Sequence, residues 1–159
     1  MKRLHVHVSV ENIEESVKFY TAMFGVAPIK QKADYAKWLV DDPSVNFAIS
    51  SKSRKPGLDH FGIQVDGEKE LAEVRERIAK AKLDTFDEGK TTCCYAEADK
   101  TWVMDPAGVA WEAYQFMGDA EIFHEAKMPP APSTACCAPK SDKAAEAKPA
   151  VPKKSSCCG

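Results

Sequence analysis

The stretch "RLHVHVSVENIEESVKFYTAMFG", residues 3–25, passes directly from a strand pattern into a helix pattern. Apolar and polar residues alternate through residues 3–10, which is typical of a strand with one buried face. Apolar residues then recur at helical spacing, at Ile13, Val17, Tyr20 and Phe24. Asn12, with Glu15 three residues later, predicts the beginning of this helix, and Gly25 predicts its end.

A second part of the chain repeats this order. "LDHFGIQV", residues 58–65, alternates as a strand, and residues 68–82 place Leu71, Val74, Ile78 and Ala81 on one helical face. Shorter strand candidates follow each helix, at 35–40 and 45–50, and then around 93–98, 101–105 and 109–116. The order of one strand, one helix and three strands, given twice, predicts an α+β fold of two βαβββ modules, about 1–54 and 57–118.

The overall composition narrows the class of protein. The 159 residues are 44% hydrophobic and 29% charged, with a net charge of −2. A charge so close to zero argues against nucleic acid as the main partner, and no apolar run approaches the roughly 20 residues that span a bilayer. The opening residues enter a strand pattern without the apolar region of a signal peptide. We therefore expect a cytoplasmic protein with one folded domain over residues 1–126.

Residues 127–159 differ sharply from the rest of the chain. They hold six of the ten prolines, together with many Ala, Lys and Ser residues. Such a segment has too few large apolar side chains to offset the entropy that is lost on ordering. We predict a flexible tail.

The six cysteines fall into three adjacent pairs: Cys93–Cys94, Cys136–Cys137 and Cys157–Cys158. Cytoplasmic thiols are kept reduced, and neighbouring cysteines bridge each other only in a strained ring, so no disulfide framework is expected. Adjacent side chains on a strand point to opposite faces, so Cys93 and Cys94 reach one target only where the chain turns or bulges. Either this pair is incidental or a thiol-seeking ligand binds it.

Two histidines and one carboxylate recur on the expected strands. His5 lies in the first strand of the first half, His60 in the first strand of the second half, and Glu112 in the last strand. Two His and one carboxylate form the facial triad of non-haem Fe(II) oxygenases, and the same donors also suit Zn(II). A histidine on an alternating strand is also common as a satisfied core or edge residue. The residues alone leave both interpretations open.

Other polar residues near these positions have less definite roles. His7 shares the strand face of His5, so it is either a contact to a ligand cavity or a structural polar residue. Tyr114 and Gln64 lie further along the strands that carry the candidate ligands, and they either line a cavity or fill the sheet interior. His124 is expected at the surface.

The segments "ESVKFYTAMFG", "DHFGIQV" and "MDPAGVAWEAY" resemble those of the vicinal oxygen chelate superfamily, which includes glyoxalase I, extradiol dioxygenases and bleomycin and fosfomycin resistance proteins. The resemblance covers about residues 1–118. It implies that the two modules form a cupped mixed sheet around a divalent metal ion. Matched residue by residue, it makes His5, His60 and Glu112 the metal ligands, and His7 is not the matched ligand.

Within that superfamily, "TTCCYAEADKTWVMDPAGVAWEAY" is closely similar to the organoarsenical carbon–arsenic lyases. This resemblance implies an Fe(II) cofactor, molecular oxygen as co-substrate, and cleavage of trivalent organoarsenicals such as methylarsenite and aromatic arsenicals to arsenite. The carbon product would be formaldehyde from a methyl group and a hydroxylated ring from an aromatic one. Trivalent arsenic is thiophilic and carries two exchangeable oxygens, so Cys93 and Cys94 would bind the substrate.

Alternatives to this interpretation stay open. A related group of cadmium-induced proteins shares much of the sequence, so a cadmium- or metalloid-binding protein is one alternative. A glyoxalase-type isomerase with Zn(II) or Ni(II) is another, although it leaves the cysteine pair unexplained. The tail cysteines, Cys136, Cys137, Cys157 and Cys158, could pass arsenite to another protein, and a second copy of the chain is a further candidate partner.

Overall fold

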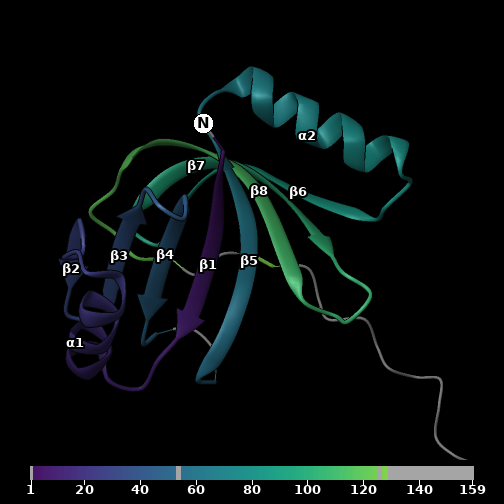
Figure 1. Ribbon diagram of the computed structural model, residues 1–159. Helices are drawn as coiled ribbons and strands as arrows, with labels where there is room; N and C mark the ends of the chain where they lie inside the picture. The colour runs from purple at the N-terminus through teal and green to yellow at the C-terminus, as the bar shows by residue number, and fades with distance from the viewer. Residues whose placement is uncertain (1, 53–54, 125–126, 129–159) are drawn as a thin grey trace, which may run out of the picture.

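The computed structural model describes residues 2–52, 55–124 and 127–128, and within them an eight-stranded mixed sheet carries two helices (Figure 1). The elements in chain order are β1 (Arg3–Ser9), α1 (Ile13–Phe24), β2 (Lys30–Lys32), β3 (Tyr35–Val40), β4 (Val45–Ser50), β5 (Gly57–Val65), α2 (Glu68–Lys80), β6 (Thr85–Cys93), β7 (Ala96–Met104) and β8 (Ala110–Asp119). The α+β class and the repeated βαβββ order are confirmed.

The sheet order, β2-β3-β4-β1-β5-β8-β7-β6, places the two modules side by side. In each module the first strand pairs in parallel with the last, β1 with β4 and β5 with β8. The antiparallel pairing of β1 with β5 then joins the modules at the centre of the sheet. The two strands that carry His5 and His60 are therefore neighbours.

The first helix follows its sequence signals. The side chain of Asn12 accepts a hydrogen bond from the backbone N–H of Glu15 at 3.1 Å, and Gly25 ends the helix in the left-handed conformation with φ 69°. Its apolar face packs on β3 and β4, around Ile13, Trp38, Phe47 and Ile49. This packing holds the outer face of the first module, so the opposite face of the sheet is left to form the cup.

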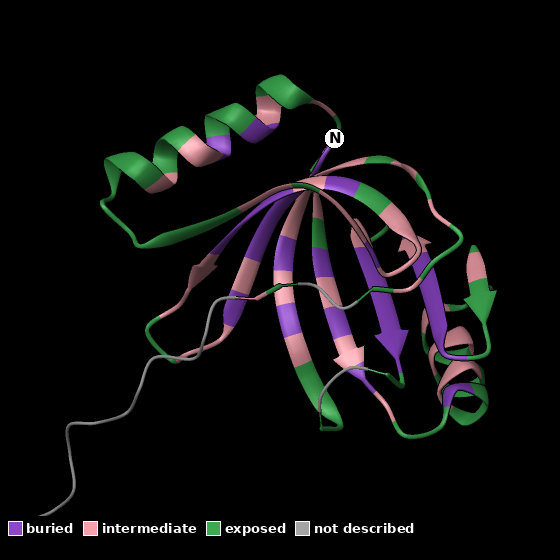
Figure 2. Cartoon of the chain, turned by 180° about the vertical axis from the view of Figure 1, so that it is seen from behind, coloured by how far each residue is buried: buried purple, intermediate pink, exposed green. Residues whose placement is uncertain are grey.

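The second helix is shorter than expected. It ends at Lys80 rather than at residue 82, and Lys82 takes a positive φ of 55°. Leu71 and Val74 pack against the second module, while Ala81 is exposed and lies outside the apolar face. In Figure 2 buried residues alternate with less buried ones along the central strands, as expected where successive side chains point to opposite faces of a sheet.

The prediction of one strand around residues 93–98 is wrong. The chain forms strand β6 up to Cys93, turns at Cys94 and Tyr95, and returns as β7 from Ala96. Both turn residues have positive φ, 53° and 61°, which is the geometry of a type I′ hairpin. That turn usually carries Asn and Gly, so the sequence signal is absent here. The short edge strand β2 was also not among the expected strands.

The described segment that follows β8, residues 120–124, lies against the β6–β7 turn. Two backbone hydrogen bonds attach it to the β6–β7 turn: Ala120 N–H to Tyr95 C=O at 3.0 Å, and Cys94 N–H to His124 C=O at 3.1 Å. The predicted tail, with Cys136, Cys137, Cys157 and Cys158, lies outside the described residues. Within the described part of the chain, neither helix has the length and apolar character needed to cross a membrane.

Candidate metal and thiol site

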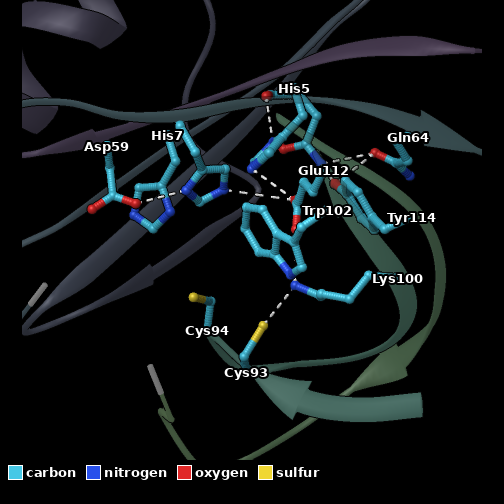
Figure 3. Close-up of polar contacts among 12 residues, drawn as sticks. His5, His7, Asp59, Gln64, Cys93, Cys94, Lys100, Trp102, Glu112 and Tyr114 are labelled. Atoms are coloured by element: carbon cyan, nitrogen blue, oxygen red, sulfur yellow. Dashed lines mark hydrogen bonds and ion pairs between the residues drawn. The ribbon is translucent and has the colours of Figure 1, made fainter. Parts of the chain in front are cut away.

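The cup brings His5, His60 and Glu112 together from β1, β5 and β8 (Figure 3). The Nε2 atom of His5 lies 3.5 Å from Glu112 Oε1, and the Nε2 atom of His60 lies 3.7 Å from the same oxygen. All three side chains are buried. One nitrogen from each of two imidazoles and one carboxylate oxygen therefore converge on a single point.

Gly62 makes this convergence possible. In the sheet register it lies between His5 on β1 and Glu112 on β8. A Cβ atom at this position would lie 2.6 Å from Glu112 Cγ and 2.7 Å from the Glu112 backbone oxygen. The absence of a side chain lets the Glu112 side chain extend across β5 toward His5.

The outer nitrogens of the two imidazoles have hydrogen-bond acceptors. His5 Nδ1 lies 3.0 Å from the backbone oxygen of Asn46, and His60 Nδ1 lies 2.6 Å from Asp59 Oδ1. A proton on Nδ1 leaves the Nε2 lone pair of each ring directed at Glu112, and this is the tautomer that metal-ligating histidines use. The donor set thus fits a divalent metal ion.

The protonation states agree with that fit. Burial lowers the pKa of His5 to about 4, so this ring is neutral near pH 7. Burial acts to raise the pKa of Glu112, but Lys100 and the two histidines outweigh it and hold the pKa well below its usual range. For His60, burial would lower the pKa, whereas hydrogen bonds to Asp59 and Glu112 raise it. A metal ion bound between the three groups would compete with a proton for the Nε2 atom of His60.

His7 joins the two histidines in the cup. Nitrogen atoms of His5, His7 and His60 lie within 4.8 Å of one another, so these three residues also make a possible ligand set. The Nε2 atom of His7 lies 2.9 Å from Ser50 Oγ, and the His7 ring centroid is 4.8 Å from that of His60. The structure places His7 inside the cavity, where it is both a cavity contact and part of a hydrogen-bonded pair.

Asn46 and Tyr114 form the wall beside His5. Asn46 Nδ2 donates to the Tyr114 hydroxyl at 2.6 Å and to Gln64 Oε1 at 2.7 Å. Tyr114 lines the cavity, whereas Gln64 lies behind it as a hydrogen-bond acceptor. Asn46 Oδ1 is buried without a hydrogen-bond partner among the described residues. A buried acceptor of this kind fits a cavity that takes a water molecule or a hydroxyl group.

The β6–β7 turn explains how adjacent cysteines face the same cavity. Cys93 is the last residue of β6 and Cys94 the first turn residue, and both line the cavity that contains His5, His60 and Glu112. Turn geometry at Cys94 removes the strand alternation that would otherwise direct the two thiols to opposite faces. Both cysteines are free thiols (Figure 3).

Lys100 connects the thiols to the candidate metal ligands. This buried ammonium on β7 lies 2.9 Å from Cys93 Sγ and 2.9 Å from Glu112 Oε2 (Figure 3). It also lies over the rings of Trp102 and Tyr114, 5.5 Å and 5.7 Å from their centroids. The sequence interpretation did not include Lys100; the available signal was a lysine on the inward face of a strand otherwise lined by small and aromatic residues.

These contacts give the two thiols different acidities. A hydrogen bond from Cys94, together with the nearby Lys100 ammonium, overcomes burial and lowers the pKa of Cys93 to about 7. The same hydrogen bond and burial raise the pKa of Cys94 well above its ordinary value. Near neutral pH about half of the Cys93 thiol is therefore ionised, whereas Cys94 keeps its proton. Such a pair offers a ready nucleophile to a thiophilic ligand.

The family model of the Glyoxalase/Bleomycin resistance protein/Dioxygenase superfamily matches residues 2–113. The chain belongs to this superfamily. It is 43% identical over 117 residues to the trivalent organoarsenical cleaving enzyme of Bacillus sp. (strain MD1), across 72% of this chain and 73% of that protein. It is 33% identical over 124 residues to the cadmium-induced protein CadI of Mycobacterium bovis, across 77% of this chain and 82% of that protein.

Solved structures agree on the fold of this glyoxalase-superfamily chain. Homoprotocatechuate 2,3-dioxygenase from Arthrobacter globiformis matches with a TM-score of 0.53 at 14% identity, across 74% of this chain and 36% of the dioxygenase. The resemblance predicted from the sequence motifs is confirmed, and both related groups, arsenical-cleaving enzymes and cadmium-induced proteins, are among the relatives.

Proposed function

We propose that this protein cleaves the carbon–arsenic bond of trivalent organoarsenicals in a reaction that depends on Fe(II) and molecular oxygen. The observation that carries the proposal is the shared cavity: a vicinal thiol pair and a set of two histidines and one carboxylate line the same cup, with Lys100 between them. Relatives named for trivalent organoarsenical cleavage support the choice of substrate.

The cysteine pair would bind the arsenical. Methylarsenite carries two hydroxyl groups on arsenic, and condensation with both thiols forms two As–S bonds and releases two molecules of water. Cys93 would attack first because its pKa of about 7 leaves a large thiolate fraction at neutral pH. Cys94 then gives up its proton as the second hydroxyl leaves as water. The carbon substituent stays on the arsenic and faces the cavity.

His5, His60 and Glu112 would hold the metal ion. Two His and one carboxylate suit Fe(II) in oxygen-using enzymes. Fe(II) at this position would supply the activation of molecular oxygen that oxidation of the carbon requires. The hydrogen bonds from His5 to Asn46 and from His60 to Asp59 would fix the two rings in the ligating tautomer.

The surrounding residues would control charge and water at the reacting bond. Lys100 offsets the negative charges of Glu112 and Cys93, which would otherwise repel each other in a buried cavity. Trp102 and Tyr114 cover Lys100 with aromatic surface. For methylarsenite the atoms balance without an external reductant, because methylarsenite and one O2 have the composition of formaldehyde and arsenite.

Oxygen consumption tests this proposal directly. Fe(II)-loaded protein should consume one O2 for each methylarsenite converted to arsenite, with formaldehyde as the carbon product. The double variant Cys93→Ser/Cys94→Ser should keep the metal and lose turnover, because hydroxyl groups are poor ligands for arsenic. Near-parent cleavage by the double variant, or turnover without O2, would refute the mechanism.

A cadmium-binding protein is the second candidate function. The three imidazoles of His5, His7 and His60 lie close together, and the Cys93 thiolate in the same cavity offers a soft donor that cadmium favours. The relation to a cadmium-induced protein points the same way. Tight, stoichiometric cadmium binding together with no arsenite production would favour this function over the lyase.

A further inference from the structure

A second lysine faces the cavity, and its environment differs from that of Lys100. Lys37 on β3 lines the cup and is only 8% exposed. Lys30, Lys52 and Lys100 each contact a carboxylate, of Asp119, Asp34 and Glu112 respectively. Lys37 is a largely buried cation that makes no ion pair with any carboxylate among the described residues.

The Lys37 side chain spans the cup toward the other module. Its Nζ atom lies 4.8 Å from the ring centroid of Phe116, although β3 and β8 are separated by three strands in the sheet. The neighbouring wall positions carry small side chains: Lys37 pairs with Ala48 on β4, and Phe116 pairs with Ala98 on β7. All four residues line the cavity that also holds Cys93 and Cys94.

This combination of side chains suits a flat, partly charged ligand group. Phe116 provides an aromatic face, and the alanines leave space beside it, where aromatic rings pack in offset or edge-on geometry. Burial and the nearby Lys30 lower the pKa of Lys37, and Asp119, which Lys30 already neutralises, offsets this only in part. A negative group on the ligand would meet a cation that is short of a partner, and charge-assisted hydrogen bonds are the stronger kind.

We propose that Lys37 and Phe116 form a subsite for the aromatic ring of an arsenical that carries a negatively charged oxygen substituent, such as a carboxylate. The inference rests on the proposed binding of arsenic by Cys93 and Cys94, because that attachment directs the ring into the rest of the cavity. Lys37 thereby sets a preference among arsenicals, for acidic aromatic ones over unsubstituted ones.

The test compares trivalent 4-carboxyphenylarsenite with phenylarsenite. Binding to metal-free protein under reducing conditions, followed by tryptophan fluorescence, should show the acid bound about tenfold more tightly than phenylarsenite, as expected when a charge-assisted contact is added. Lys37→Met should abolish this preference and leave the affinity for phenylarsenite within about twofold. Lys37→Arg should retain most of the preference because it keeps the charge.

Lys32→Met provides a matched control. Lys32 lies on the neighbouring strand β2, is exposed, and contacts the Tyr95 ring from outside the cavity. Its loss should leave the preference unchanged if the effect is local. Equal affinity of the parent protein for the two ligands overturns the inference without any variant, and so does a Lys37→Met variant that weakens both ligands alike.

Turnover separates this inference from the proposed function. If the two aromatic ligands bind as expected but neither they nor methylarsenite are cleaved by the Fe(II)-loaded protein with O2 and a thiol reductant, the lyase proposal fails and the subsite stands. If methylarsenite is cleaved and the binding preference is absent, the subsite fails and the lyase proposal stands.

Discussion

The two modules carry the same histidine but differ at the next inward position of the strand. When "RLHVHVSV" and "LDHFGIQV" are aligned on His5 and His60, His7 and Gly62 occupy equivalent positions of the two sequences. In the sheet, His7 pairs with Ala48 on β4, whereas Gly62 pairs with Glu112 on β8. The first module therefore combines a large side chain with a small neighbour, and the second combines no side chain with a large neighbour.

This exchange makes the cup asymmetric. In the second module the missing side chain at Gly62 lets Glu112 reach the two imidazoles, so one carboxylate serves histidines from both modules. In the first module His7 fills the equivalent space, and Ala48 leaves room beside Lys37. A repeated fold thus provides one candidate metal site. The metal-binding residues lie at one end of the cavity, and the space for a substrate lies at the other.

The largest expected effect comes from removing the carboxylate of the second module. Glu112→Gln should release the metal and reduce turnover by at least about a hundredfold. Loss of a residue that only hydrogen-bonds to a metal ligand already lowers metal affinity or activity by about 10- to 100-fold, and Glu112 would be a ligand itself. The measurement is metal content after dialysis, together with arsenite release. His7→Asn is the matched control from the first module, and we expect it to retain the metal. One equivalent of bound metal in Glu112→Gln, or equal metal loss in both variants, would contradict the ligand assignment.

Gly62→Ala should break the asymmetry from the other direction. The added Cβ would lie 2.6 Å from Glu112 Cγ and 2.7 Å from its backbone oxygen, so β8 has to shift. We expect a loss of about 1–3 kcal/mol in the free energy of unfolding, typical of overpacking, together with weaker metal binding. Gly67→Ala is the control, since nothing lies within 4 Å of a Cβ there. Thermal unfolding and metal titration of the two variants decide the point: unchanged metal affinity in Gly62→Ala removes the role given to this glycine.

The fold, and the meeting of His5, His60 and Glu112 in one cavity, were predictable because they rest on local, repeated signals. The alternating residues around His5 and His60 form strands in the structure, as predicted. The helix predicted after Asn12 also begins there, with Asn12 as its cap. Since strands at equivalent places in a repeat come together in one sheet, residues far apart in the chain could be assigned to a common site.

The turn at Cys94 and Tyr95 and the role of Lys100 were not predictable in the same way. Both turn residues have positive φ without being Gly, Asn or Asp, so the hairpin left no local signal. Tertiary contacts hold it instead, including the backbone bond from Cys94 to His124. The inward pattern of β7 marks the position of Lys100, but its role follows from the packing: a lysine on a strand is normally exposed, and here Glu112 and the Cys93 thiolate make its burial favourable.

Removal of Lys100 should act on thiol acidity. In the parent the pKa of Cys93 is lowered to about 7, so its reaction with iodoacetamide should rise with pH through 7 and level off above about pH 8. Lys100→Met removes the cation that favours the thiolate, so the midpoint moves to higher pH. At pH 7 the rate should fall about five- to tenfold, since a shift of one pH unit is a factor of ten in thiolate population. Lys90→Met, on the exposed part of β6, is the control. An unchanged midpoint in Lys100→Met would show that Cys94 alone lowers the pKa.

The smallest expected effect comes from shortening the chain, and it tests whether the site depends on anything beyond the two modules. Cys93 and Cys94 are held in the cavity by the β6–β7 turn, and the backbone carbonyl of His124 accepts a hydrogen bond from Cys94. A chain that ends after Met128 keeps those contacts. Any contact that residues 129–159 made with the cavity would carry the entropic cost of closing a long loop. Methylarsenite cleavage by the shortened chain should therefore stay within about twofold of the parent. A chain that ends after Asp119 loses the hydrogen bonds at Ala120 and His124, so its KM for methylarsenite should rise severalfold while its metal content is unchanged. Loss of turnover in the longer of the two truncated chains, under reducing conditions, would assign the cysteines at 136, 137, 157 and 158 a direct part in the reaction.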